Sequence, residues 1–244
     1  MGLPTIAVPQ YELTIPSTEK KAKYRPFLVK EEKVLLIALE SENQTNIINA
    51  IRTIITNCLY GDVTVDEMPT FDLEFIFLQL RAKSKGEVID LKYECPKCKT
   101  ELEVNINTDD VQVIKTPEHT HTIELDDGLG VVMKYPTIEM QQMIQDIQED
   151  KKSEIEGIFT MVTKCIDYIY DKENTYPLKD HTDKEINDFI DSLTDVHFQK
   201  ISKFFETMPV LQHEFQLKCT KKKKDKTCSY KETIILSGLQ SFFV

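Results

Sequence analysis

Apolar residues recur with the spacing of a helix in two stretches of the first third of the chain. The face of the first stretch is formed by Ile47, Ile48, Ile51, Ile54, Ile55 and Cys58. The face of the second is formed by Leu73, Ile76, Phe77 and Leu80. Thr70 is a candidate N-cap for the second stretch and Gly86 lies beyond its end, although its aromatic residues also alternate as in a strand. We therefore expect residues 31–86 to be mainly helical, with Cys58 as a buried core thiol.

The apolar period changes to two between Glu87 and Met133. The runs "EVIDLKYEC", "TELEVNI" and "HTIELDDGLGVVMKY" alternate apolar and polar residues, as half-buried strands do. The sequence "DDGLG" between two apolar runs predicts a hairpin turn. Residues 87–135 are therefore expected to form a β region, and a C-x2-C knuckle lies inside it.

Helical periodicity returns after residue 135. One stripe is formed by Met140, Met143, Ile144 and Ile147, and a second by Ile155, Ile158, Phe159, Val162, Ile166 and Ile169, with Cys165 beside it. Thr182 and Glu185 form a capping box that opens a third helix. Its stripe is Ile186, Phe189, Ile190 and Leu193, and a continuation from Thr194 carries Phe198, Ile201, Phe205 and Met208 up to Pro209. We expect an inserted helical bundle over residues 136–209, followed by a C-terminal β region over 210–244.

The first 30 residues are predicted to form an extended arm. Four of the ten prolines lie within residues 1–26, and "TIAVPQYELTIP" alternates as an edge strand does. The segment is net positive, and it could pack on its own domain or lie across a neighbouring subunit. The predicted fold class is α+β: a zinc-ribbon-like module of two cysteine-bearing hairpins, interrupted by a helical insertion and preceded by this arm.

Four cysteines suggest the metal site of such a module. Cys95 and Cys98 form a C-x2-C knuckle between strand-like runs, and Cys219 and Cys228 also lie between two such runs. Two hairpins that each present two thiolates hold a tetrahedral structural Zn²⁺ without an open position for water. The C-x8-C spacing of the second pair is longer than usual, but loop length costs free energy only slowly. The rival ligands are His119 and His121, which would share one face of a strand.

Composition narrows the function classes. The 244 residues carry a net charge of −11, which disfavours general nucleic-acid binding. No apolar run approaches the roughly 20 residues that span a bilayer, and Met1–Lys20 does not have the pattern of a signal peptide. A reducing compartment is expected, in which neighbouring cysteines bind metal or pack in the core. The phosphate-binding, zinc-protease and nucleophile-elbow motifs are missing, so we expect no enzyme.

Several short motifs resemble a known family. They are "YEL" at Tyr11–Leu13, "PS" at Pro16–Ser17, "YRPFLVKEEK" at Tyr24–Lys33, "KSKGE" at Lys83–Glu87 and "ECPKC" at Glu94–Cys98. Together they resemble the baseplate hub and hub-assembly proteins of T-even-like contractile-tailed phages, most strongly over the first 100 residues. The resemblance implies a non-enzymatic component of the tail baseplate, located in the virion and in the host cytoplasm during assembly. Its partners would be other baseplate proteins and further copies of this chain, and no contact with a membrane is expected.

Partner contacts are expected from the arm and from the C-terminal "LQSFFV". The candidate residues are Tyr11, Leu13, Tyr24, Arg25, Phe27, Phe242 and Phe243. For the C-terminal residues the alternative is packing as a final strand of the chain's own sheet. The alternative function is a zinc ribbon that binds nucleic acid through the loop "KKKKDK", against which stand the acidic net charge and the lack of aromatic residues in the lysine run.

Overall fold

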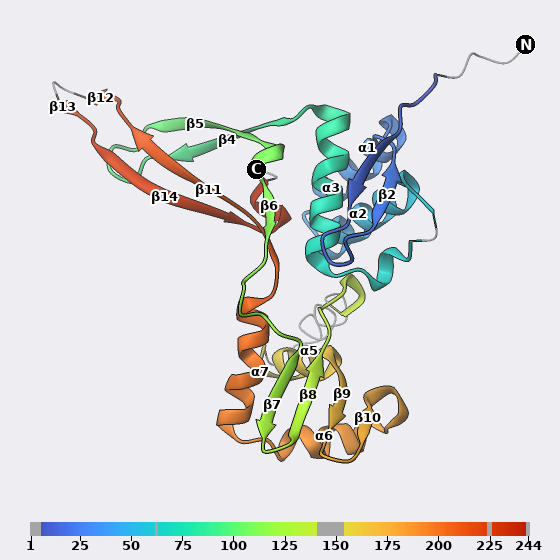
Figure 1. Ribbon diagram of the computed structural model, residues 1–244. Coiled ribbons are helices and arrows are strands. Elements are labelled where there is room, and N and C mark those ends of the chain that lie inside the picture. The colour runs from blue at the N-terminus through green and yellow to red at the C-terminus, as the bar shows by residue number, and fades with distance from the viewer. Residues whose placement is uncertain (1–5, 62, 141–153, 224–225, 243–244) are drawn as a thin grey trace, which may run out of the picture. The chain divides into compact units, whose positions relative to one another are not determined.

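The computed structural model describes residues 6–61, 63–140, 154–223 and 226–242, and it shows helices together with several antiparallel sheets (Figure 1). The mixed α+β class is therefore as predicted. The chain divides into two compact units. Unit 1 comprises Met1–Val65, Phe71–Ile114 and Val210–Val244, and unit 2 comprises Asp66–Thr70 and Lys115–Pro209.

The N-terminal segment of unit 1 folds back on itself. β1 (Tyr11–Thr14) pairs antiparallel with β2 (Lys21–Tyr24), and β2 pairs with β3 (Leu59–Tyr60). In the turn, the Glu19 N–H donates to the Ile15 carbonyl and the Ile15 N–H donates to the Lys20 carbonyl. The described part of residues 1–30 is thus a hairpin followed by the start of α1, where an extended arm was predicted. Several of its apolar side chains, among them Leu13, Ile15 and Tyr24, are buried within unit 1, which agrees with the alternative that the segment packs on its own domain.

Three helices follow in unit 1: α1 (Val29–Glu40), α2 (Gln44–Cys58) and α3 (Thr70–Lys85). The predicted stripe of α2 turns inward, and Ile54, Ile55 and Cys58 are fully buried. The second predicted stretch is the helix α3 and not a strand. Its apolar residues point in several directions, as is typical of a helix surrounded by protein. Gly86, with a φ of 112°, ends it in the left-handed conformation that glycine adopts without strain.

Polar side chains of α3 hold three other segments of unit 1. Asp72 accepts hydrogen bonds from the backbone and side chain of Ser17. The Ser84 hydroxyl accepts from the Phe27 N–H at 2.9 Å, and the Glu74 carboxylate accepts from the Leu239 N–H at 3.1 Å. Helix α3 therefore connects the N-terminal hairpin and the C-terminal residues to one core.

Two longer ribbons of strands also belong to unit 1. β4 (Val88–Glu94) pairs with β5 (Glu101–Asn107), while β11 (Val210–Cys219) lies between β14 (Tyr230–Ser237) and β6 (Gln112–Ile114). Apolar residues of both ribbons share two adjoining core clusters. The C-terminal residues form a 3-10 helix, η4 (Leu239–Phe242), with Leu239 and Phe242 buried. They are therefore not a final strand, although they do pack in the chain's own core.

Unit 2 is a four-stranded antiparallel sheet with helices packed on it, and not a helical bundle. The strands, in the order β10-β9-β8-β7, are β7 (Thr122–Asp126), β8 (Leu129–Met133), β9 (Ile166–Tyr170) and β10 (Thr175–Pro177). The helices are α5 (Glu154–Cys165), α6 (Asp183–Asp191) and α7 (Asp195–Thr207). Short 3-10 turns complete the chain at η1 (Val65–Glu67), η2 (Thr108–Asp110) and η3 (Leu178–Asp180).

Local predictions in unit 2 have mixed outcomes. The "DDGLG" hairpin and the Thr182 capping box are confirmed. The stripe predicted to run to Ile169 is wrong beyond Cys165, because Ile166–Tyr170 pairs with strands on both sides. The hairpin β7–β8 belongs to this sheet and not to the cysteine-bearing ribbon. Of the first predicted stripe, Met143, Ile144 and Ile147 lie outside the described residues.

Candidate metal centre

The four cysteines predicted as ligands lie together in unit 1. Their Sγ atoms are all within 4.8 Å of one another, with 3.8 Å between Cys95 and Cys228 and 3.6 Å between Cys98 and Cys219. A tetrahedron of thiolates about 2.3 Å from a metal ion has edges of about 3.8 Å. The sulfur atoms are thus spaced as ligands of a single ion.

A tight turn presents the first pair. The Lys99 N–H donates to the Cys95 carbonyl at 2.8 Å, and the Cys95 N–H donates to the Thr100 carbonyl at 2.9 Å. Lys99 has a φ of 58°, which lets the chain reverse directly after Cys98. Both thiols consequently lie at the tip of the β4–β5 ribbon.

The long spacing of the second pair is explained by a small hairpin. Cys219 is the last residue of β11 and pairs with Tyr230 of β14. Between them, β12 (Lys222–Lys223) pairs with β13 (Lys226–Thr227), and the Cys228 N–H donates to the Lys221 carbonyl at 2.9 Å. The β12–β13 hairpin therefore accounts for the longer spacing, while the Sγ atoms of Cys219 and Cys228 stay within 4.8 Å of each other.

The thiols of the cluster differ in pKa. Cys95, Cys219 and Cys228 are buried and Cys98 is half-buried, in a core that includes Leu102 and Leu217. Hydrogen bonds with the side chain and backbone of Thr100 lower the pKa of Cys98 to about 6. Although the backbone of Lys221 lowers the pKa of Cys219, burial and the neighbouring cysteines raise it to about 12, and burial raises the pKa of Cys228. Lys218 precedes Cys219 and Lys221 follows it closely in the sequence, and positive charge near a cysteine favours its thiolate form. Four such ligands fill a tetrahedral coordination shell and leave no position for a reactive water.

The other two cysteines are core residues, as predicted. Cys58 and Cys165 are fully buried, and burial raises the pKa of the first to about 11 and of the second to about 12. Both are therefore kept as neutral thiols.

The rival ligands His119 and His121 lie in an aromatic cluster of unit 2. His119 Nδ1 is 2.9 Å from Thr207 Oγ1, and His121 Nδ1 is 2.7 Å from the Met133 carbonyl. The His119 ring stacks on Tyr135 with ring centroids 5.5 Å apart. Burial, together with the neighbouring His121, lowers the pKa of His119. Within the described ranges, no third potential ligand joins this pair, whereas the four cysteines do form a group.

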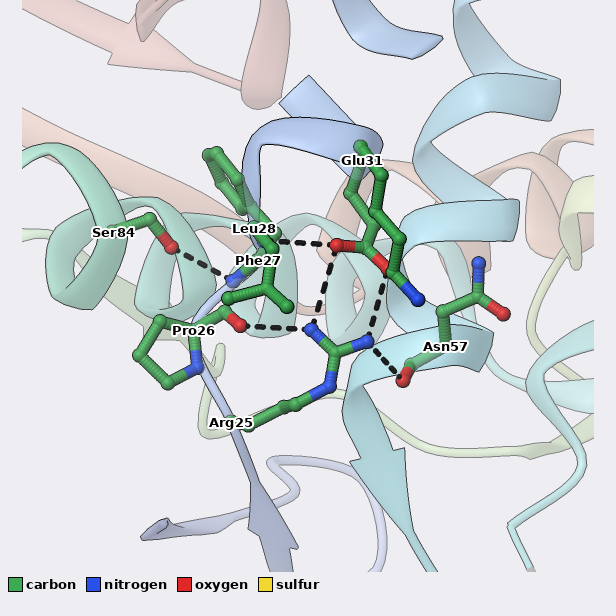
Figure 2. Close-up of polar contacts among 8 residues, drawn as sticks. Arg25, Pro26, Phe27, Leu28, Glu31, Asn57 and Ser84 are labelled. Atoms are coloured by element: carbon green, nitrogen blue, oxygen red, sulfur yellow. Dashed lines mark hydrogen bonds and ion pairs between the residues drawn. The ribbon is translucent and has the colours of Figure 1, made fainter. Parts of the chain in front are cut away.

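The "YRPFLVKEEK" motif forms a buried polar network in unit 1 (Figure 2). The Arg25 guanidinium donates to Glu31 at 2.9 Å and to the carbonyls of Pro26 and Asn57 at 3.0 Å each. Glu31 in turn accepts from the Leu28 N–H at 2.8 Å, which caps the start of α1. Burial alone would raise the pKa of Glu31, but these hydrogen bonds hold it below its ordinary value.

Most of the side chains that were predicted to bind partners make contacts within unit 1. Leu13, Tyr24, Phe27 and Phe242 are buried, and Arg25 is in the network just described. Tyr11 is half-buried against the Tyr24 ring, with ring centroids 5.7 Å apart. Phe243 lies outside the described residues. These observations agree with the packing alternative, and the partner-binding role stays a prediction.

Sequence reasoning missed a set of exposed apolar side chains on α1. The run "VLLIAL" at residues 34–39 is apolar around most of the helix, and this pattern could have indicated that some of its apolar side chains are exposed. Only Leu35 and Ala38 of this run are buried.

The comparisons with known proteins identify one family. The family model described as "T4 bacteriophage base plate protein" matches residues 8–244. Neither the curated proteins nor the solved structures give a match. No helix among the described residues is long and apolar enough to cross a membrane. Because the family model covers almost the whole chain, this protein belongs to the T4 bacteriophage base plate protein family.

Proposed function

We propose that this protein is a structural or assembly component of the central hub of a phage tail baseplate and holds one structural zinc ion. The observation that carries the proposal is the family match over residues 8–244, which supports a structural role in the virion tail and interaction with other tail proteins. The hub assignment rests further on the motif resemblance at Tyr24–Lys33. Contacts with other hub proteins and with copies of itself, during assembly in the host cytoplasm, are part of the proposal. The family match gives no support to the nucleic-acid alternative.

Zinc is the metal that the cluster suits best. Thiolates are preferred ligands of Zn²⁺, and the Sγ spacings of 3.6 and 3.8 Å suit one tetrahedral ion. An iron–sulfur cluster would attach its cysteines to different iron atoms and hold their sulfur atoms farther apart. A closed set of four cysteines gives the ion a structural role and supports a protein that is not an enzyme.

A genetic experiment tests the hub proposal. An amber codon early in this gene, in a non-suppressing host, should give heads and tail fibres but no complete baseplates. A plasmid copy of the natural gene should restore them, whereas a Cys219→Ser copy should not. Normal baseplates from the amber phage would contradict the proposal.

A further inference from the structure

Helix α1 exposes an unusual amount of apolar surface for a short helix. It buries only Glu31, Leu35 and Ala38, which follow one another at helical spacing. On other sides of the helix, Val29 is 80% exposed, Ile37 57% and Leu36 48%. The exposed large hydrophobic residues from the N-cap of α1 to its end are Leu28, Val29, Val34, Leu36, Ile37 and Leu39. Concentrated exposure of this kind marks a protein-binding surface.

Two charged residues flank the centre of this surface. Lys33 and Glu40 are exposed and lie seven residues apart, which puts them on the same side of the helix. Leu36 and Ile37 lie midway between them, so each charge is about 5 Å along the axis from the centre. The neighbouring charges have partners within unit 1, since Lys30 pairs with Glu31 at 3.4 Å and Glu32 with Lys85 at 2.7 Å.

This arrangement is self-complementary. If two copies of α1 lie antiparallel about a two-fold axis between Leu36 and Ile37, Leu36 faces the partner's Ile37. In the same register Lys33 faces the partner's Glu40, and the symmetry repeats both contacts. A parallel arrangement would instead place Lys33 against Lys33 and Glu40 against Glu40.

We propose that α1 is a self-association surface on which a second copy of this chain binds, with the two α1 helices antiparallel and centred on Leu36 and Ile37. The proposal specifies the self-contact that is part of the proposed hub function and rests on it. The Arg25–Glu31 network and the Leu28 cap hold the first turn of α1 in place, while the Glu32–Lys85 pair ties the helix to α3. The surface is thus formed before the partner arrives, which lowers the entropic cost of association.

Light scattering and sedimentation of the purified full chain test this contact. The natural protein should form a dimer whose population rises with concentration. Ile37→Asp should abolish the dimer, while Ile155→Asp, a matched change at an exposed position of α5, should leave it intact. Circular dichroism checks that both variants keep the natural fold. A natural protein that stays monomeric, or a dimer that survives Ile37→Asp, overturns the proposal.

A charge exchange tests the orientation. Lys33→Glu and Glu40→Lys should each raise the dimer Kd by about tenfold, since each places like charges opposite one another twice. The double variant restores opposite charges and should return the Kd close to the natural value. Single variants without effect, or a double variant as weak as either single one, rule out the antiparallel register. These measurements use purified protein and do not depend on the phage experiment. The dimer would still be detectable if the hub proposal failed in the phage, and a failed dimer test would leave the outcome of the phage experiment unchanged.

Discussion

The Sγ atoms of Cys98 and Cys219 lie 3.6 Å apart although the two residues are separated by 121 positions in the chain. The segment Lys115–Pro209, which makes up most of unit 2, lies between them in sequence. A metal ion at this cluster would therefore connect two segments of unit 1 that are far apart along the chain. Since such a site does not exist in the unfolded chain, the free energy of metal binding becomes part of the free energy of folding.

Loss of one thiolate should therefore weaken both metal binding and folding. Protein purified without chelator is expected to hold about one zinc per chain, measured by elemental analysis. Cys219→Ser should lose the metal and lower the free energy of unfolding by at least about 4 kcal/mol, or roughly 10 °C in Tm. His119→Ala serves as control and should keep the zinc. The ligand assignment would be wrong if His119→Ala lost the metal while Cys219→Ser kept it.

Removal of the guanidinium from the motif network should be costly. The Glu31 side chain is 3% exposed, so Arg25→Ala leaves a buried carboxylate whose remaining cation is the exposed Lys30, at 3.4 Å. The expected loss in the free energy of unfolding is about 3–5 kcal/mol, measured by urea denaturation. The matched control is Lys21→Ala, which breaks the exposed pair with Glu12 and should produce no measurable change. Equal effects of the two variants would show that the network does not stabilise unit 1.

Two carboxylates of unit 1, the half-buried Glu74 and the buried Glu31, should respond to pH with opposite signs. Burial raises the pKa of Glu74, only partly offset by the Leu239 N–H, so its charge destabilises the folded state at neutral pH. Glu74→Gln should raise the Tm at pH 7, and this gain should disappear as the pH falls below the ordinary value of 4.5.

The depressed pKa of Glu31 contributes stability that is present above pH 4.5 and is lost as the pH falls through the folded pKa. Glu31→Gln should therefore lower the Tm at pH 7, and the deficit should shrink on acidification. Thermal melts of both variants between pH 3 and 7 provide the comparison. Shifts of the same sign at pH 7 would contradict the assigned environments.

The C-terminal aromatic residue Phe242 offers a test between packing and partner binding. It is 1% exposed in the core shared by both ribbons of unit 1. Phe242→Ala should cost the isolated protein about 3–5 kcal/mol in chemical denaturation. Ile235→Ala, at an exposed position of β14, should have little effect on stability. An unchanged stability for Phe242→Ala would favour a role in partner binding alone.

Features that depend on residues close together in the chain could be predicted from the sequence. The capping box at Thr182, the hairpin at "DDGLG" and the end of α3 at Gly86 each arise from contacts within a few residues. The grouping of the four cysteines could also be predicted, because two cysteine pairs that each lie between strand-like runs have the pattern of a metal site with ligands from two hairpins.

Long-range pairing decided what the sequence left ambiguous. Ile166–Tyr170 continues a helical stripe, yet it forms a strand because its backbone pairs with β8 and β10. The N-terminal hairpin packs within unit 1 because two side chains of α3 accept hydrogen bonds from this part of the chain: Asp72 accepts from Ser17, and Ser84 accepts from the Phe27 N–H. Likewise, only the packing of α1 showed that Leu35 and Ala38 turn inward while Leu36 and Ile37 remain exposed. In each case the free energy comes from residues distant in the chain, which periodicity within one segment cannot reveal.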